Sequence, residues 1–268
     1  MTMKTGFQIT RGDRRFFLLT IGLIFLAHAT AYLTHEYAHA TTAWLLGWMH
    51  SPIGIDYGRA SLANLLFQQD VGDGVDYAPI FASGHGLQAA LIAFDGPGIG
   101  NGLIYVLCFA MLGRASIQTR PTLAMFLFWL ALMGAGNVWS YAPMRTVTTH
   151  ADMALVARGL GISTWLLLPI VTAPALLILW SFFFRLLPLA RRTFFARSQA
   201  ADTLVTVMSC FFYFVYFGDN GLDFAYGEVC ALLSIGSQFV VFPLAIMACL
   251  AWSRADDYGR PQDGPHQN

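Results

Sequence analysis

The residues best suited to chemistry are two histidines and a glutamate in the segment His35-Glu36-Tyr37-Ala38-His39. On an α-helix, side chains four positions apart lie on one face a turn apart, so both imidazoles can bind the same metal ion. Glu36 lies beside the first histidine, where it can reach a water on that ion without being a ligand itself. This HExxH pattern is typical of zinc hydrolases, in which the glutamate is the general base.

The pattern lies inside an apolar helix that we expect to run from about residue 16 to residue 48 and to remain uncleaved. Inserting a charged side chain at bilayer depth costs about 2.5 to 3.5 kcal/mol on insertion scales. The presence of Glu36 between two histidines in an apolar helix therefore indicates a function. The alternative is a hydrogen-bonded polar cluster that holds no metal. His28 lies seven residues before His35 and shares its face, and we expect it to be a buried polar residue and not a ligand.

The composition indicates a membrane protein. Hydrophobic residues make up 56% of the 268 residues and charged residues only 11%, which is too little polar material to cover a soluble globule. We therefore predict an all-α, polytopic helix bundle in a lipid bilayer, with no nucleic acid as a partner. The cysteines fall singly in apolar segments and predict neither a disulfide framework nor a cysteine zinc site: Cys108, Cys210, Cys230 and Cys249.

Hydrophobic runs predict about six transmembrane helices, at residues 16–48, 80–112, 121–141, 163–185, 203–217 and 228–252. The expected organisation is a basic N-terminus at 1–15, a core of three spans at 16–163, three further spans at 164–252, and a polar, disordered tail at 253–268. Twelve of the 15 Lys and Arg residues fall on one side of such an arrangement, which predicts that both termini are cytoplasmic. The expected location is a bacterial inner membrane.

Two segments between or within the spans have unusual patterns. Ile53, Ile55 and Tyr57 alternate with polar or small residues, which favours a short β-hairpin whose edge could hold an extended peptide; an ordinary surface loop fits equally well. Residues 94–102 contain four glycines and a proline, which in a membrane let neighbouring helices approach closely. Asn101 lies in this segment, either near the metal pair or in helix packing.

A catalytic zinc ion usually has three protein ligands and one water, and the HExxH pattern supplies only two of them. We predict Asp152 as the third, because it follows the third span on the outer side of the membrane, where the rise of the first helix also places His35. The pattern leaves other ligands open, first His150 and Asp95 and then His85, Asp223 and Glu228.

The order of these motifs resembles the site-2 protease family of intramembrane zinc proteases over about residues 16–163. The resemblance rests on the HExxH helix, then Gly96-Pro97 and Asn101, then Asn137 and Pro143 ahead of Asp152. It implies that His35, His39 and Asp152 bind zinc, that Glu36 activates water, and that the substrate is a transmembrane or membrane-adjacent segment of another protein.

The expected function is therefore that of an intramembrane, zinc-dependent endopeptidase. Asn101, Asn137, Arg145 and His150 are expected to support the site or bind substrate; Arg145 could stabilise Asp152 or an oxyanion, or form a structural ion pair. The alternatives are a non-catalytic membrane metal-binding or scaffold protein, a di-iron oxygenase and a transporter. The metal content of the purified chain separates these hypotheses. A zinc protease holds one zinc ion, a di-iron oxygenase holds two iron ions, and a scaffold holds no metal.

Overall fold

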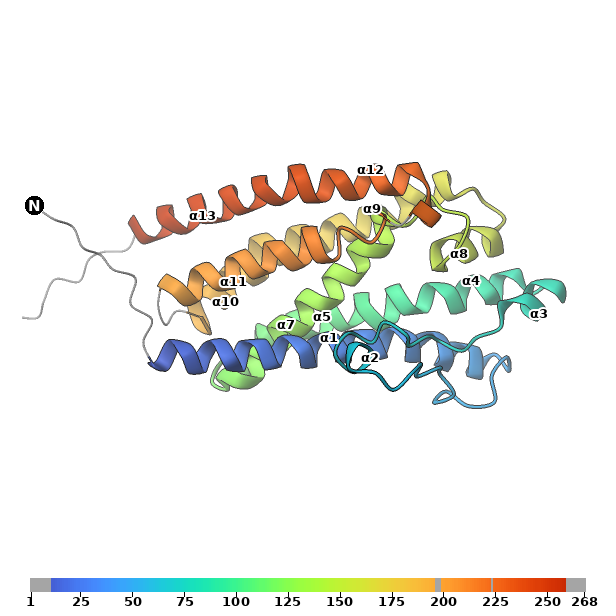
Figure 1. Cartoon of the computed structure of the whole chain (residues 1–268), viewed down its shortest axis with the longest axis horizontal. Coiled ribbons are helices and arrows are strands. Elements are labelled where there is room, and N and C mark those ends of the chain that lie inside the picture. Colours follow the sequence, from blue (N-terminus) through green and yellow to red (C-terminus); the bar gives the residue numbers. More distant parts are fainter. Residues whose placement is uncertain (1–10, 196–198, 223, 259–268) are drawn as a thin grey trace, which may run out of the picture.

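The computed structural model describes residues 11–195, 199–222 and 224–258, and every regular element within these ranges is helical (Figure 1). The elements in chain order are α1 (Arg11–Leu45), α2 (Leu62–Phe67), α3 (Tyr77–Ala82), α4 (Gly86–Asp95), η1 (Gly96–Leu103), α5 (Ile104–Leu112), α6 (Ala115–Gln118), α7 (Pro121–Trp139), η2 (Ser140–Met144), α8 (Asp152–Leu160), α9 (Thr164–Ser181), η3 (Phe182–Leu186), α10 (Leu187–Thr193), α11 (Gln199–Phe211), η4 (Phe212–Tyr216), η5 (Phe224–Tyr226), α12 (Glu228–Gly236), η6 (Ser237–Val241) and α13 (Phe242–Tyr258). The all-α prediction is confirmed for the described residues.

Five helical stretches of the described residues are long and apolar enough to cross a membrane: Arg14–Leu45, Gly86–Leu112, Pro121–Met144, Thr164–Thr193 and Glu228–Trp252. Their outward surfaces carry exposed apolar side chains, among them Leu18, Leu107, Leu177 and Phe239, as a lipid environment requires. The chain is therefore a membrane protein. The fifth of the six predicted spans, at 203–217, corresponds to α11 and η4, which are not among these five stretches.

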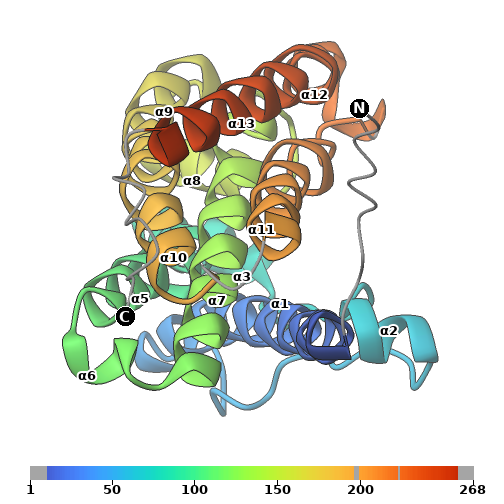
Figure 2. The ribbon, with the colours of Figure 1, turned by 90° about the vertical axis from the view of Figure 1, so that its left-hand side faces the viewer.

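Helix α7 lies at the centre of the bundle (Figure 2). It packs against α1, η1 and α5 on one side and against α9 and η4 on the other. Large aromatic side chains fill the space around it, including Phe128, Trp129, Phe182, Phe195 and Tyr213, all fully buried. This central helix joins the first half of the chain to the last three long helices, so the bundle is continuous.

The second predicted span is divided, because α3 ends at Ala82 and a new helix, α4, begins at Gly86. Gly84 between them has a φ of +81°, a backbone conformation that favours glycine and interrupts a helix. The membrane-crossing part is therefore Gly86–Leu112, which combines α4, η1 and α5. Within it, η1 is a π-helical segment that covers the glycine-rich sequence.

The β-hairpin expected near residues 53–57 is not confirmed. Within the described residues, the loop after α1 forms a single antiparallel bridge, in which the backbone groups of Asp56 and Gly72 exchange hydrogen bonds of 3.0 and 2.9 Å. Helix α2, which begins after the Ser61 cap, lies between these two residues. The pairing joins two distant points of one loop, so it is not the pairing of a tight hairpin.

The predicted terminal segments are described only in part. Helix α1 begins at Arg11, inside the expected N-terminal segment 1–15, and residues 1–10 lie outside the described residues. Helix α13 continues to Tyr258, into the segment expected to be a disordered tail, and residues 259–268 lie outside the description. In Figure 1, α1 begins and α13 ends at the same end of the bundle.

Candidate metal centre

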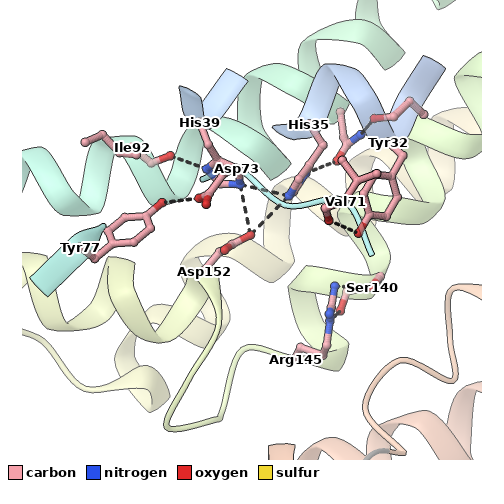
Figure 3. A network of polar contacts seen from close by, with 12 residues as sticks. Tyr32, His35, His39, Val71, Asp73, Tyr77, Ile92, Ser140, Arg145 and Asp152 are labelled. Carbon is pink, nitrogen blue, oxygen red and sulfur yellow. Dashed lines mark hydrogen bonds and ion pairs between the residues drawn. The ribbon is translucent and has the colours of Figure 1, made fainter. Parts of the chain in front are cut away.

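Three side chains from two distant segments meet at one point (Figure 3). Helix α1 supplies His35 and His39, which are only 4% and 1% exposed, and the first residue of α8 supplies Asp152. The two Nε2 atoms lie 3.1 Å apart, and the Oδ2 atom of Asp152 lies 3.4 and 3.5 Å from the Nε2 atoms of His35 and His39. Within the described part of the chain, this is the group of His, Cys and acidic residues that could hold a metal ion.

The spacing of the three ligand atoms fits a tetrahedral ion. Zinc bonds of about 2.0 to 2.1 Å at tetrahedral angles place ligand atoms about 3.3 Å apart, close to the observed 3.1 to 3.5 Å. An octahedral ion with bonds of similar length would hold adjacent ligands about 3.0 Å apart. Two imidazoles and one carboxylate are a common set of zinc ligands and leave a fourth position open. The residues present therefore fit zinc.

Hydrogen bonds fix both imidazole rings with Nε2 toward Asp152. His39 Nδ1 lies 2.6 Å from the backbone oxygen of Ile92, which can only accept, so Nδ1 carries a proton and, in the neutral ring that binds a metal, Nε2 carries the lone pair. His35 Nδ1 likewise donates to the side-chain oxygen of Asn101 at 2.7 Å, and the Asn101 amide donates to the Ala31 oxygen at 3.0 Å. Asn101 is fully buried and bonds to His35, which places it beside the histidine pair, one of the two positions considered for it.

The glycine-rich segment lets η1 lie directly against the two histidines. A Cβ atom on Gly96 would lie 2.1 Å from His39 Nε2, and one on Gly100 would lie 2.6 Å from the Cα atom of His35. Both distances are far below van der Waals contact, so only glycine fits at these positions. The prediction that these glycines permit close helix approach is confirmed, and the side on which they do so is that of the metal ligands.

Asp152 reaches the site because α8 packs closely on α4. Gly159 of α8 lies so near α4 that a Cβ atom there would be 2.2 Å from the Gly86 backbone oxygen. Burial by itself raises the pKa of the Asp152 carboxyl, but His39 and His35 in their protonated forms outweigh that effect and hold the pKa well below its usual value. An ionised carboxylate is also the form that binds a metal ion.

Glu36 is buried beside the ligands, with 8% of its surface exposed. His39, Asp152 and Asp73 lie close enough to Glu36 to interact with its carboxyl group electrostatically. Asp73 belongs to the loop after α1, accepts a hydrogen bond of 3.1 Å from the Tyr77 hydroxyl, and lies beside His39 in Figure 3. Sequence reasoning missed Asp73, because several aspartates in that loop have no spacing that distinguishes one from another.

Among the described residues, the other candidate ligands lie outside the group of three. His150 stacks on Tyr226, Asp95 accepts a hydrogen bond from the Thr42 hydroxyl, and His85 contacts Ser83 and Trp48. Glu228 begins α12, and Asp223 lies outside the described residues. The structure therefore brings the predicted third residue, Asp152, to the two histidines.

Two of the expected supporting residues have other contacts. The Asn137 amide donates to the Met133 oxygen of its own helix at 3.0 Å, and no contact of Asn137 with the three ligands occurs among the described residues. Arg145, which could have stabilised Asp152 or formed a structural ion pair, makes no ion pair among the described residues. The Arg145 guanidinium lies instead over the ring of Tyr141, 4.2 Å from its centre.

Tyr141 is a second residue of the site that sequence reasoning missed. Its ring stacks on the His35 imidazole, with centres 4.8 Å apart and planes inclined by 19°. A tyrosine near the end of an apolar helix carries no spacing signal, so only the packing of η2 against α1 identifies it.

His28 is a buried polar residue, as expected. Its ring nitrogens lie 3.2 Å from the Gln68 side-chain oxygen and 2.5 Å from the Tyr216 hydroxyl. Both nitrogens thus have side-chain partners, and His28 is not one of the three grouped ligands. Among the described residues, the candidate ligands that lie together are therefore His35, His39 and Asp152.

The chain was compared with protein-family models, with curated proteins and with solved structures, and no match was found in any of the three comparisons.

Proposed function

We propose that the chain is an intramembrane, zinc-dependent endopeptidase, similar to the site-2 proteases, that cuts a transmembrane or membrane-adjacent segment of another protein. One observation carries the proposal: two imidazoles and one carboxylate lie at the separations of a tetrahedral zinc site. The two histidines and the buried Glu36 beside them belong to a helix that is apolar and long enough to span a membrane. Residues arranged in this way suit hydrolysis of a peptide bond near the membrane surface.

His35, His39 and Asp152 would hold the zinc ion. When bound, zinc lowers the pKa of a water towards about 7 and polarises a carbonyl group. Glu36 accepts the proton of the attacking water as general base and then donates it to the leaving amine as general acid. Asn101 and the Ile92 carbonyl keep the two imidazoles in the required tautomer and orientation throughout.

The substrate segment has to unwind before it is cut, because the peptide groups of a helix are hydrogen-bonded to one another. In this proposal the loop after α1 receives the unwound segment. A hydrogen bond from Tyr32 to the Val71 oxygen holds this loop against α1, and the same loop carries Asp73 beside His39 (Figure 3). The proposed location is a bacterial inner membrane with both termini in the cytoplasm, a proposal that rests on the distribution of basic residues.

The general-base role is tested by Glu36→Gln, which keeps the size of the side chain and removes its basicity. We expect cleavage of membrane-protein reporters to fall about 10²- to 10⁴-fold, the usual contribution of acid–base catalysis, while zinc content stays at one ion per chain. Glu228→Gln, the same change at the exposed start of α12, is the control and should leave cleavage unchanged. Normal cleavage by Glu36→Gln with zinc bound would rule out the proposal.

The same preparations test the ligand set by elemental analysis. Asp152→Asn should lose zinc, whereas Asp95→Asn, which alters a carboxylate bonded to Thr42, should retain it. Zinc in a wild-type chain that cleaves no reporter would favour the alternative, a non-catalytic membrane metal-binding protein. A metal-free chain would favour a scaffold, and iron in place of zinc would favour an oxygenase.

A further inference from the structure

Arg145 is the charged group near the metal centre that the proposed reaction does not use. It donates to the Ser140 backbone oxygen at 3.4 Å, to the Ser140 hydroxyl at 3.0 Å and to the Tyr226 hydroxyl at 3.2 Å. A guanidinium group carries five N–H donors, so these bonds leave one N–H on each terminal nitrogen. No carboxylate of the described residues lies within 4.0 Å of it.

Two aromatic rings hold the guanidinium group. Its central carbon lies 4.2 Å from the ring centre of Tyr141 and 5.4 Å from that of Tyr226. Such cation–π contacts favour the charged group and fix its orientation, but they supply no negative charge. The acidic groups nearby are already engaged, Asp152 by the two histidines and Glu36 by the proposed proton transfer. Arg145 therefore keeps a fixed, partly exposed positive charge that no carboxylate of the described residues contacts directly.

The distance from Arg145 to the metal ligands decides what this charge can bind. His35 stacks on the Tyr141 ring with centres 4.8 Å apart, and the guanidinium carbon of Arg145 lies 4.2 Å from the centre of the same ring. The guanidinium carbon is therefore at most about 9 Å from the centre of the imidazole, the length of roughly three residues of an extended chain at about 3.3 Å each. Arg145 thus lies within reach of side chains up to about three residues from a bond held at the metal centre.

We infer that Arg145 binds a carboxylate of the substrate, two or three residues from the bond that is cut, so that the enzyme selects segments with Asp or Glu at that distance. The inference rests on the proposed function. The planar fork of a guanidinium group matches the two oxygens of a carboxylate. The carboxylate would also supply a direct ion-pair partner, which Arg145 lacks among the described residues.

The test uses membrane-anchored reporter proteins that share one apolar helix and differ by Asp or Asn at single positions around the cut, which mass spectrometry locates. With the wild-type enzyme, Asp two or three residues from the cut should raise kcat/KM at least tenfold over Asn. Arg145→Gln should reduce this ratio to less than twofold, and Arg145→Lys should retain part of it. Arg158→Gln is the control, because Arg158 also packs on an aromatic ring, that of Phe81, but lies on α8 away from the ligands.

An equal Asp-to-Asn ratio in the wild type and Arg145→Gln, with reporters cleaved by both, would overturn the inference and leave the proposed function standing. Zinc content and thermal unfolding of each variant show that the site is intact. If the wild type cleaves no reporter, the proposed function fails, and a binding measurement then tests the role of Arg145. Glu36→Gln protein should bind a fluorescent Asp dodecapeptide at least tenfold more tightly than its Asn counterpart. The further substitution Arg145→Gln should abolish this difference in affinity.

A lipid phosphate offers the same chemistry as a carboxylate and is the competing outcome. Nanodiscs of phosphatidylcholine with and without phosphatidylglycerol separate the two ligands. If Arg145→Gln weakens the preference for the anionic lipid and leaves the Asp-to-Asn ratio unchanged, Arg145 is a lipid contact and the inference is wrong. If it changes the peptide ratio alone, the inference holds.

Discussion

At the scale of single residues, the metal centre depends on groups that do not bind the metal. Each histidine presents Nε2 because its Nδ1–H is occupied by an oxygen, that of Ile92 for His39 and that of Asn101 for His35. A freely rotating imidazole would have to lose that freedom each time it bound an ion. The two oxygen acceptors remove this cost in advance, so we expect them to raise the affinity of the candidate site for a metal ion.

This argument predicts the effect of Asn101→Ala. His35 would lose its acceptor, and zinc affinity should fall about 10- to 100-fold, the usual effect of removing the partner of a metal-binding histidine. Competition with a chelating dye measures the change. Asn137→Ala is the matched control, since that amide bonds to the Met133 oxygen of its own helix, and its zinc affinity should equal that of the wild type. Equal affinities for both variants would contradict the assigned role of Asn101.

At the scale of elements, the π-helical segment η1 is the part of the second span that touches the ligands. π-helical turns widen a helix and occur mostly at functional sites. Here the segment is also rich in glycine, so its backbone lies against the side chains of His35 and His39 where any larger residue would collide with them. The element therefore forms one wall of the metal centre.

The wall predicts different outcomes for two Gly→Ala substitutions in the same segment. Gly96→Ala should abolish zinc binding, because the added methyl group would lie 2.1 Å from His39 Nε2. Gly102→Ala should bind zinc normally, because its methyl group would be 3.4 Å from its nearest neighbour, the Pro97 oxygen. Both variants carry the same change in helix propensity, so a difference in zinc content reports the collision alone. Normal zinc content in Gly96→Ala would mean that η1 does not lie against the ligands.

At the scale of the whole molecule, the described helices begin and end at the same end of the bundle (Figure 1). An even number of crossings produces that arrangement, yet only five described stretches meet the length and hydropathy of a span. The segment Gln199–Tyr216, formed by α11 and η4, supplies the sixth crossing if it spans the membrane while packed against α13 and η6. Its buried face includes Thr206 and Ser209, which lowers its hydropathy.

We predict that tags at the two termini lie on the same side of the membrane, in the cytoplasm. Protease protection in sealed inverted and right-side-out vesicles measures this directly, and a tag placed in the loop before α2 should show the opposite accessibility. Termini on opposite sides would mean that α11 and η4 do not cross. Both termini outside would preserve the six crossings but reverse the orientation.

The sequence by itself determined the features that arise from short-range geometry and composition. A spacing of four places His35 and His39 on one face of any helix, whatever the rest of the chain does, and apolar runs of spanning length indicate a membrane helix independently of its neighbours. It also singled out the glycines of 94–102 as points of close approach, because glycine has no side chain. These predictions need no knowledge of which segments meet.

Only the tertiary structure decided which distant groups complete the site. Asp152, His150 and Asp95 were all chemically competent, and the packing of α8 on α4 brings Asp152 alone among them to the histidines. Tyr141 over His35 likewise follows from contacts between segments more than 100 residues apart, which no local pattern encodes. The physical reason is that the formation of a helix depends on residues close together along the chain. Which distant side chains meet at one point depends instead on how complete helices pack against one another.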